Sequence, residues 1–187
     1  MHRMHHTRLA AAVVPLIVLG CTGIGAPKSV TMPPDSAAGE VAFHLAGPNG
    51  TAIIVPAVLN GHDSVSLILD TGATLTCLDD SVARDMKLPE RIGAVGSGVV
   101  VGGTGRIRLV KLDSIKVGGA SARDLTACAI DLSNVRQISP KVRGLLGLNF
   151  LRNFRVTLDF ERNVVRLQPP TPTSTSAGTS GARATAR

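Results

Sequence analysis

Short stretches of alternating apolar and polar residues recur along the middle of the chain. They are separated by clusters of Gly, Pro and Asn, and they lie at 41–45, 53–59, 65–69, 107–117, 125–130 and 156–167. A period of two is typical of β-strands that bury one face, and Asn60-Gly61 between two of these stretches is a strong hairpin signal. Only 80–86 and the short segment 149–153 favour helices. The pattern therefore predicts an all-β domain with one or two short helices.

The first twenty residues have a different pattern. Arg3 and Arg8 precede an uncharged run at 9–20, as in a secretory signal peptide, and Val18-Leu19-Gly20-Cys21 resembles a bacterial lipobox. An uncleaved membrane anchor, or cleavage at a nearby small residue, would also fit this run. We expect a signal peptide over 1–20, lipidation at Cys21, and a periplasm-facing location in a bacterial cell envelope, anchored to the membrane by lipid.

Composition sets the limits of the folded part. Pro, Ser, Gly and Ala dominate 21–39 and 169–187, and we expect a flexible linker and a disordered tail there. The remaining segment, 40–168, is large enough for one domain.

The formal net charge of +7 raises the possibility of nucleic-acid binding, but the basic residues are scattered. The chain has no Trp or Tyr and only four Phe, so no platform for stacked bases is expected and nucleic acid is not an expected partner. His44 and His62 have no Cys or carboxylate at ligand spacing, so we expect neither a metal site nor a cofactor.

The apolar run Leu67-Ile68-Leu69 ends at the carboxylate of Asp70, which Thr71 and Gly72 follow. Such a run is typical of a buried strand, and a charge delivered by it is costly unless chemistry or a partner uses it. The alternative is a turn residue that caps the next segment. A second apolar segment that contains glycine, Leu145-Leu146-Gly147, follows about seventy residues later, and the glycine-rich stretch 93–105 lies between the two.

Together these segments resemble, in order and spacing, the motifs of retropepsin-like aspartic proteases. The resemblance covers 53–167 and implies a single-lobed closed β-barrel with a flap hairpin over the substrate. The flap tip would lie near Gly102, Gly103 and Thr104, whose backbone could pair with an extended peptide. A generic glycine-rich hairpin would also explain this stretch.

The resemblance also implies the chemistry. One lobe supplies one aspartate, so the family forms homodimers in which Asp70 of each copy shares an activated water. Asp70, Thr71 and Gly72 would form the catalytic motif, and Ala73 would border the substrate. The function implied is that of an aspartic endopeptidase cleaving extended peptide or protein segments in the cell envelope. The alternative is a catalytically silent retropepsin-like lipoprotein that binds peptides or envelope partners.

Two cysteines besides Cys21 lie in the predicted domain. Export would permit Cys77 and Cys128 to form a disulfide, and two free buried thiols are the other possibility.

Overall fold

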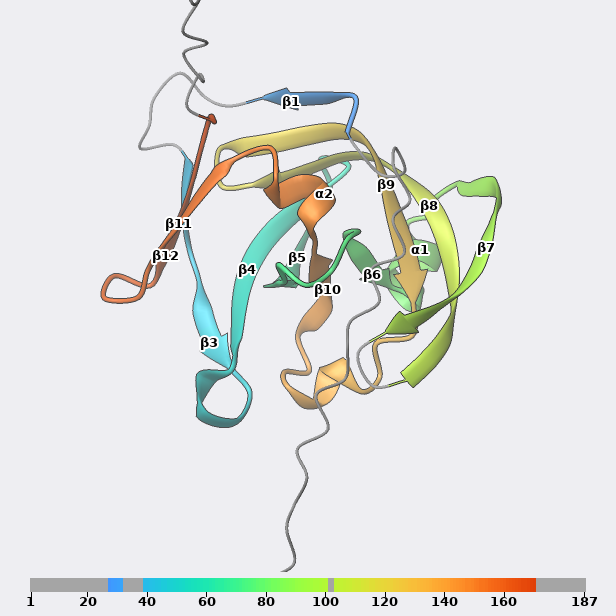
Figure 1. Cartoon of the computed structure of the whole chain (residues 1–187), viewed down its shortest axis with the longest axis horizontal. Helices are drawn as coiled ribbons and strands as arrows, with labels where there is room; N and C mark the ends of the chain where they lie inside the picture. The colour runs from blue at the N-terminus through green and yellow to red at the C-terminus, as the bar shows by residue number, and fades with distance from the viewer. Residues whose placement is uncertain (1–26, 32–38, 101–102, 171–187) are drawn as a thin grey trace, which may run out of the picture.

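The computed structural model describes residues 27–31, 39–100 and 103–170, and β-strands dominate this part of the chain (Figure 1). The strands are β1 (Ser29–Thr31), β2 (Glu40–Ala42), β3 (His44–Ala46), β4 (Ala52–Leu59), β5 (Asp63–Leu69), β6 (Cys77–Asp79), β7 (Glu90–Val100), β8 (Gly103–Val117), β9 (Ala120–Ile130), β10 (Val142–Leu146), β11 (Arg155–Asp159) and β12 (Val164–Gln168). The helices are α1 (Asp80–Asp85) and α2 (Leu148–Leu151), with 3₁₀ turns at Pro48–Gly50 and Val135–Gln137. The expected all-β class is confirmed.

Six strands of the larger sheet are linked in a ring of pairings. β5 lies between β4 and β10, β10 pairs with β6, β6 with β9, β9 with β8, and β8 returns to β4. The last link is narrow, because β4 and β8 share only the pairs Val58 with Lys116 and Leu59 with Ile115. The strands therefore form a barrel that is not fully closed, whereas the sequence predicted a closed one.

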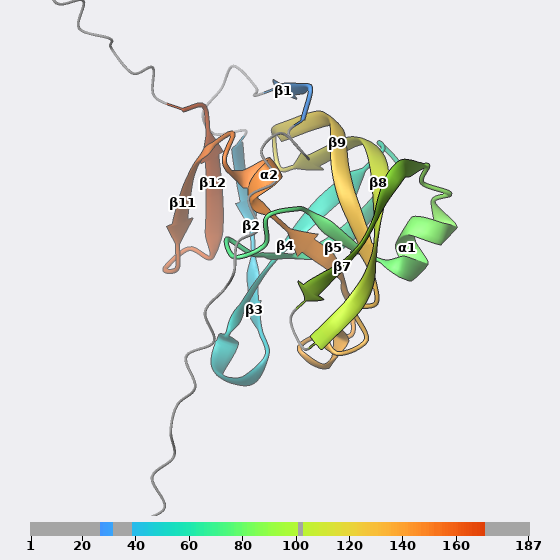
Figure 2. The same ribbon diagram turned by 45° about the vertical axis from the view of Figure 1, so that its right-hand side comes forward.

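A smaller sheet lies beside the barrel, in the strand order β11-β12-β2. Figure 2 shows it next to α2 and β4. Its inner face carries Val41, Val165 and Leu167, which join the main apolar core. Its outer face carries Glu40, whose carboxylate accepts hydrogen bonds from Arg166 (2.8 Å from Nε) and Arg162 (3.2 Å). These hydrogen bonds from Arg166 and Arg162 lower the pKa of Glu40.

The main core fills the space between the barrel strands and the small sheet. Its fully buried members include Phe150, Leu67, Leu78, Leu112 and Leu146. Each buried leucine of this kind contributes roughly 2 kcal/mol to the free energy of unfolding. α1 covers one side of this core with Val82 and Ala83. The core thus packs against both strands, β5 and β10, that lead to the candidate site.

Three strands were expected neither from the alternation pattern nor from the glycine-rich hairpin. β1 lies inside the segment expected to be a linker and pairs antiparallel with β9 at Arg123, Ala122 and Ser121. β6 and β10 are short and take their places through pairing with distant strands.

Among the described residues, no helix is both long and apolar enough to cross a membrane. The predicted signal segment and Cys21 lie outside the described residues.

Candidate active site

Asp70 lies at the carboxyl end of β5, where β5 runs parallel to β10. The two strands are in register at Leu69 with Leu146, and the Asp70 N–H donates to the carbonyl oxygen of Leu146 (3.1 Å). The side chain of Asp70 is half-buried, and one of its carboxylate oxygens accepts a hydrogen bond from the N–H of Gly72 (2.8 Å). The bond to Leu146 therefore fixes the backbone of Asp70, and the bond from Gly72 fixes its carboxylate.

The loop that follows Asp70 is open to solvent in the single chain. Thr71 and Gly72 are exposed, and Ala73 is half-buried. A Cβ on Gly72 would lie 3.2 Å from the Asp70 carboxylate, so a side chain there would press on the functional group. Ala73 is fixed through its backbone, because its carbonyl oxygen accepts the N–H of Leu148 at the start of α2 (2.8 Å).

Gly147 is required by close packing of the backbone. A Cβ at this position would lie 2.3 Å from the carbonyl oxygen of Leu75, closer than any real contact. Gly144, on β10, has a similar constraint against the carbonyl oxygen of Cys77 (2.4 Å). The Leu145-Leu146-Gly147 motif therefore supports the Asp70 loop by lying directly against it.

A buried hydrogen-bond network joins the end of the Asp70 loop to α2. The side-chain oxygen of Asn149 accepts from the backbone N–H of Thr76 (2.8 Å) and from its hydroxyl (2.9 Å). The Asn149 amide group donates to the carbonyl oxygen of Thr126 on β9 (2.8 Å), and the Gly147 N–H donates to the Thr76 hydroxyl (3.2 Å). Thr76 is 0% and Asn149 2% exposed, so water does not replace these bonds. Neither Thr76 nor Asn149 was predicted from the sequence to support the site.

Cys77 and Cys128 form a disulfide between β6 and β9. The two residues are direct neighbours in the parallel pairing of these strands, and their Cα atoms are 4.4 Å apart. The bond lies one residue after Thr76, so it attaches the end of the Asp70 loop covalently to β9. This resolves the two possibilities that the sequence left open.

The aspartyl protease family model matches residues 55–150, slightly more than half of the chain. The chain belongs to the aspartyl protease family. Its match begins in β4 and ends in α2, so it includes Asp70, the Asn149 network and the β7–β8 hairpin. No curated protein matches the chain in sequence.

Solved structures similar to this aspartyl protease family member include a retropepsin-like aspartic protease from Rickettsia conorii, with 15% identity, a TM-score of 0.47, and coverage of 75% of this chain and 93% of that one. Another is the EIAV protease with a bound inhibitor, with 20% identity, a TM-score of 0.40, and coverage of 53% and 84%. A third is the retroviral protease-like domain of Ddi1 from Leishmania major, with 17% identity, a TM-score of 0.41, and coverage of 66% and 98%.

The expected flap corresponds to the antiparallel hairpin of β7 and β8. Its backbone is described up to Val100, which pairs with Gly103, and Thr104 follows opposite Val99. Gly102 lies outside the described residues. In this aspartyl protease family member the base of the hairpin is fixed by ion pairs, because Arg108 on β8 donates to Asp80 of α1 (2.6 Å) and to Glu90 at the start of β7. Both interactions raise the pKa of Arg108.

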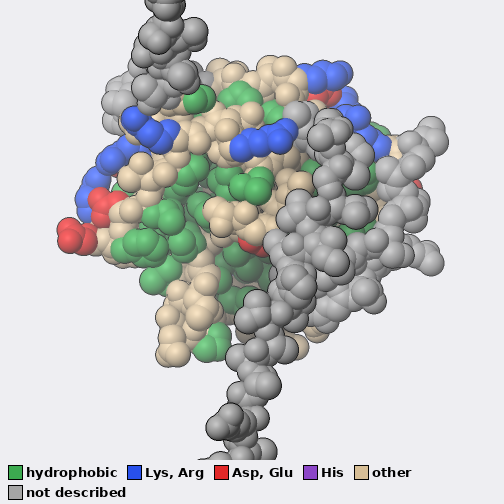
Figure 3. All heavy atoms as spheres, viewed as in Figure 1, with side chains coloured by type: hydrophobic (Ala, Val, Ile, Leu, Met, Phe, Trp, Pro, Cys, Tyr) green, Lys and Arg blue, Asp and Glu red, His purple; other side chains and the backbone are tan. Residues whose placement is uncertain are grey.

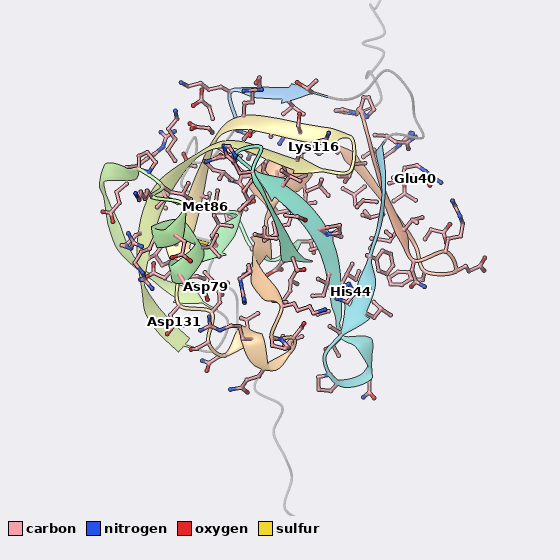
Figure 4. All side chains as sticks on the ribbon, turned by 180° about the vertical axis from the view of Figure 1, so that it is seen from behind. Glu40, His44, Asp79, Met86, Lys116 and Asp131 are labelled. Atoms are coloured by element: carbon pink, nitrogen blue, oxygen red, sulfur yellow. A yellow bond between two sulfur atoms is a disulfide. The ribbon has the colours of Figure 1, made fainter. Side chains whose placement is uncertain are left out.

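A second polar group is buried at the start of α1. Asp79 is 3% exposed, and its carboxylate accepts from the N–H (3.0 Å) and hydroxyl (2.5 Å) of Ser81, while Arg136 lies 3.3 Å away. Burial raises the pKa of Asp79, but the hydrogen bonds from Ser81 and the charge of Arg136 outweigh it, and the pKa is lowered overall. Figure 4 shows Asp79 beside α1. The Asp79 carboxylate caps the start of α1 by accepting the Ser81 N–H, and this group is separate from Asp70.

Other sequence-predicted positions have structural roles. Leu78 is fully buried in the core, and Leu75 is half-buried beside Gly147. His44 on β3 and His62 in the β4–β5 turn are exposed. Within the described ranges, no group of three or more His, Cys, Asp or Glu side chains could hold a metal ion.

Proposed function

We propose that this chain is an aspartic endopeptidase whose active site forms when two copies pair and bring their Asp70 carboxylates together. The observation that carries this proposal is the placement of Asp70. It is fixed by the Leu146 carbonyl and the Gly72 N–H, it is half-exposed, and it is followed by the exposed residues Thr71 and Gly72. Membership of the aspartyl protease family supports the same reaction.

The mechanism follows from what one carboxylate lacks. A single Asp70 can accept a proton from water, but it cannot at the same time donate one to the substrate. With two copies, an ionised Asp70 takes a proton from a shared water, which attacks the carbonyl carbon of the peptide bond. The protonated Asp70 of the partner donates a hydrogen bond to the carbonyl oxygen, and a proton then passes to the leaving amine. The pair of carboxylates titrates as a unit, so the rate should pass through a maximum between two apparent pKa values.

The substrate would be an extended segment of a peptide or protein. Such a segment can lie between the Asp70 loop and the β7–β8 hairpin, where Gly103 and Thr104 offer backbone groups for strand-like pairing. Ala73, which is half-buried beside the carboxylate, would border it. The sequence pattern around Cys21 supports a lipid anchor, so the substrates would be those of the bacterial cell envelope.

A cleavage experiment tests the proposal directly. The purified full chain should cut members of a diverse peptide library, and Asp70→Asn should abolish cutting while the variant still folds and still forms the dimer. Asp85→Asn is the matched control, because Asp85 is an exposed carboxylate on α1, and it should cut as the wild type does. Cleavage that persists in Asp70→Asn would refute the aspartic mechanism. A dimer without any cleavage would instead favour the silent lipoprotein that binds peptides.

The envelope location has its own test. Cells that express the full chain and are fed a radiolabelled fatty acid should label the wild type and not Cys21→Ser. An unlabelled wild type would refute the lipid anchor and leave the peptidase proposal unaffected.

A further inference from the structure

The disulfide between Cys77 and Cys128 lies at the point where the Asp70 loop joins the barrel. Cys77 is the first residue of β6, and the loop ends one residue before it, at Thr76. β6 has only three residues, which pair with β9 along their whole length and with β10 at two positions. Strand ends that have few backbone hydrogen bonds open easily. The covalent bond therefore reinforces the chain where strand pairing is shortest.

A short series of contacts leads from the disulfide to Asp70. The sulfur of Cys77 lies 3.5 Å from the carbonyl oxygen of Leu75. The same oxygen lies against Gly147, where a Cβ would be only 2.3 Å from it. Gly147 follows Leu146, whose carbonyl oxygen accepts the Asp70 N–H. A displacement of Cys77 would therefore be passed to the backbone that fixes Asp70.

The buried hydrogen-bond network also meets the disulfide. The carbonyl oxygen of Thr76 accepts the N–H of Cys128 (2.9 Å), while the N–H and hydroxyl of Thr76 donate to Asn149. Thr76 and Asn149 are both buried. If β6 separated from β9 at this point, water would reach these bonds and compete for them. The disulfide closes the junction at which that separation would begin.

Surface charges do not hold the Asp70 loop. Within the described residues, none of the ion pairs involves residues 71–76. Figure 3 shows Lys and Arg side chains in the upper and left parts of one face, whereas hydrophobic and uncharged groups occupy most of its middle. In Figure 1, which has the same view, the loop between β5 and β6 crosses this middle in green. The loop therefore depends on its backbone bonds, on the buried network and on the disulfide.

We propose that the Cys77–Cys128 disulfide is an activation switch. With two free thiols the Asp70 loop is loosely held and the chain does not cut peptides, and formation of the bond fixes the loop and allows cleavage. The inference rests on the proposed function for the activity that it controls, and it goes further by naming what turns the site on. A chain that passes through a reducing cytoplasm before export, as its first twenty residues predict, would stay inactive until it meets an oxidant outside.

The step that sets the switch is thiol–disulfide exchange with an oxidant that carries a disulfide. The thiolate of one cysteine attacks a sulfur of the oxidant and releases one thiol, and the thiolate of the other cysteine attacks the mixed disulfide and releases the second. Two protons and two electrons leave the chain, one S–S bond forms in it, and the oxidant disulfide becomes two thiols. Cys77 and Cys128 are direct neighbours across β6 and β9, so the second attack requires no change of strand register.

Burial makes the switch one-way in the folded chain. Cys77 is 8% and Cys128 2% exposed once the bond has formed. Thiol–disulfide exchange needs access to a sulfur atom, so the folded, oxidised chain should resist reduction. In the reduced chain the loosely held loop gives the oxidant the access that it needs.

Nuclear magnetic resonance and peptide cleavage together test the switch. The full chain with Cys21→Ser keeps only these two cysteines, and it is compared after reduction with a phosphine and after oxidation with oxidised glutathione. In the reduced chain we expect backbone order parameters of residues 71–76 to fall below about 0.6, from about 0.85 in the oxidised chain. Those of β12, which lies between β11 and β2, should not change. Cleavage should be at least about tenfold slower in the reduced chain, because a small misplacement of a catalytic group has a large effect on rate.

The double substitution Cys77→Ala with Cys128→Ala is the matched control, and it should behave as the reduced chain under both conditions. Equal order parameters in the two redox states, or equal cleavage, would overturn the proposal. So would a reduced chain that is unfolded or that loses order in β12 as much as in the loop, because the effect would then be global. A loop that gains order on oxidation in a chain that cuts no peptide in either state would uphold the structural switch and refute the peptidase.

The one-way property has a separate measurement. The oxidised chain is incubated with reduced glutathione, folded or unfolded in urea, and free thiols are counted by mass spectrometry after alkylation. We expect the folded chain to keep its disulfide and the unfolded chain to lose it. Equal rates of reduction would show that burial does not protect the bond and would refute this part of the inference.

Discussion

Replacing Thr76 with Val tests whether the buried network supports the Asp70 loop. Val has nearly the same shape as Thr but lacks the hydroxyl, so the substitution removes two hydrogen bonds with little change in volume. These are the bond that Thr76 donates to Asn149 (2.9 Å) and the bond that it accepts from the Gly147 N–H (3.2 Å).

The cost follows from which groups lose a partner. The Gly147 N–H is buried and loses the acceptor that the Thr76 hydroxyl provides, at about 1–3 kcal/mol. The Asn149 oxygen keeps the backbone N–H of Thr76 and loses one neutral hydrogen bond, at about 0.5–1.5 kcal/mol. The free energy of unfolding should therefore fall by about 2–4 kcal/mol. Thr76→Ser, which keeps the hydroxyl and loses one methyl group, should cost only about 1 kcal/mol.

Urea unfolding of both variants and the wild type, with the disulfide intact, measures the difference. Peptide cleavage is measured on the folded fraction, and we expect kcat to fall in Thr76→Val more than in Thr76→Ser, since Gly147 lies against the loop that carries Asp70. If Thr76→Val proves no less stable than Thr76→Ser, the hydroxyl does not support the loop and the argument from the network fails.

Three further perturbations have expected outcomes of their own. The double substitution Cys77→Ala with Cys128→Ala opens a link across 51 residues and should lower the free energy of unfolding by about 2–4 kcal/mol in urea titration, and a reducing agent should destabilise the wild type but not this variant. Gly147→Ala should cost more than about 4 kcal/mol or prevent folding, whereas Gly61→Ala, with a φ of 75° but no atom within 4 Å of the new Cβ, should cost only about 1 kcal/mol by the same measurement. The pKa of Asp79 is lowered in the folded protein, so the stability that its ionised carboxylate contributes is fully present above the unfolded pKa near 3.8 and is lost as the pH falls through the folded pKa. The difference in free energy of unfolding between wild type and Asp79→Asn should therefore shrink on acidification. A difference that stays constant with pH would refute this linkage.

The alternation of apolar residues predicted most strands because those strands bury one face. β4, β5, β8, β9 and the β11–β12 hairpin all lie where the period of two indicated them. The short strands β6 and β10 could not be found in this way, because three to five mostly buried residues show no alternation. Their positions depend on partners far away in the chain, such as Cys128 for Cys77 and Ile68 for Leu145.

The catalytic motif of the candidate site could be predicted from the sequence. The hydrogen-bond network that supports it could not, because only folding brings its residues together. Asp70, Thr71 and Gly72 form a local signal. Thr76 and Asn149 lie 73 residues apart, and nothing in the sequence gives their distance. One signal was present: Asn149 is a lone amide in the apolar segment at 145–151, and a polar group buried in such a segment needs a hydrogen-bond partner.

The half-exposed state of Asp70 in one chain has a consequence for assembly. Water still reaches the carboxylate, because Asp70 is only half-buried in the single chain. Covering this loop with a second copy would remove that water and place two like charges together, so pairing should favour the state in which the two carboxylates share one proton. Other contacts between the two copies would then have to offset this cost. Under the proposed function, the paired carboxylates would therefore make the dimer dissociation constant depend on pH.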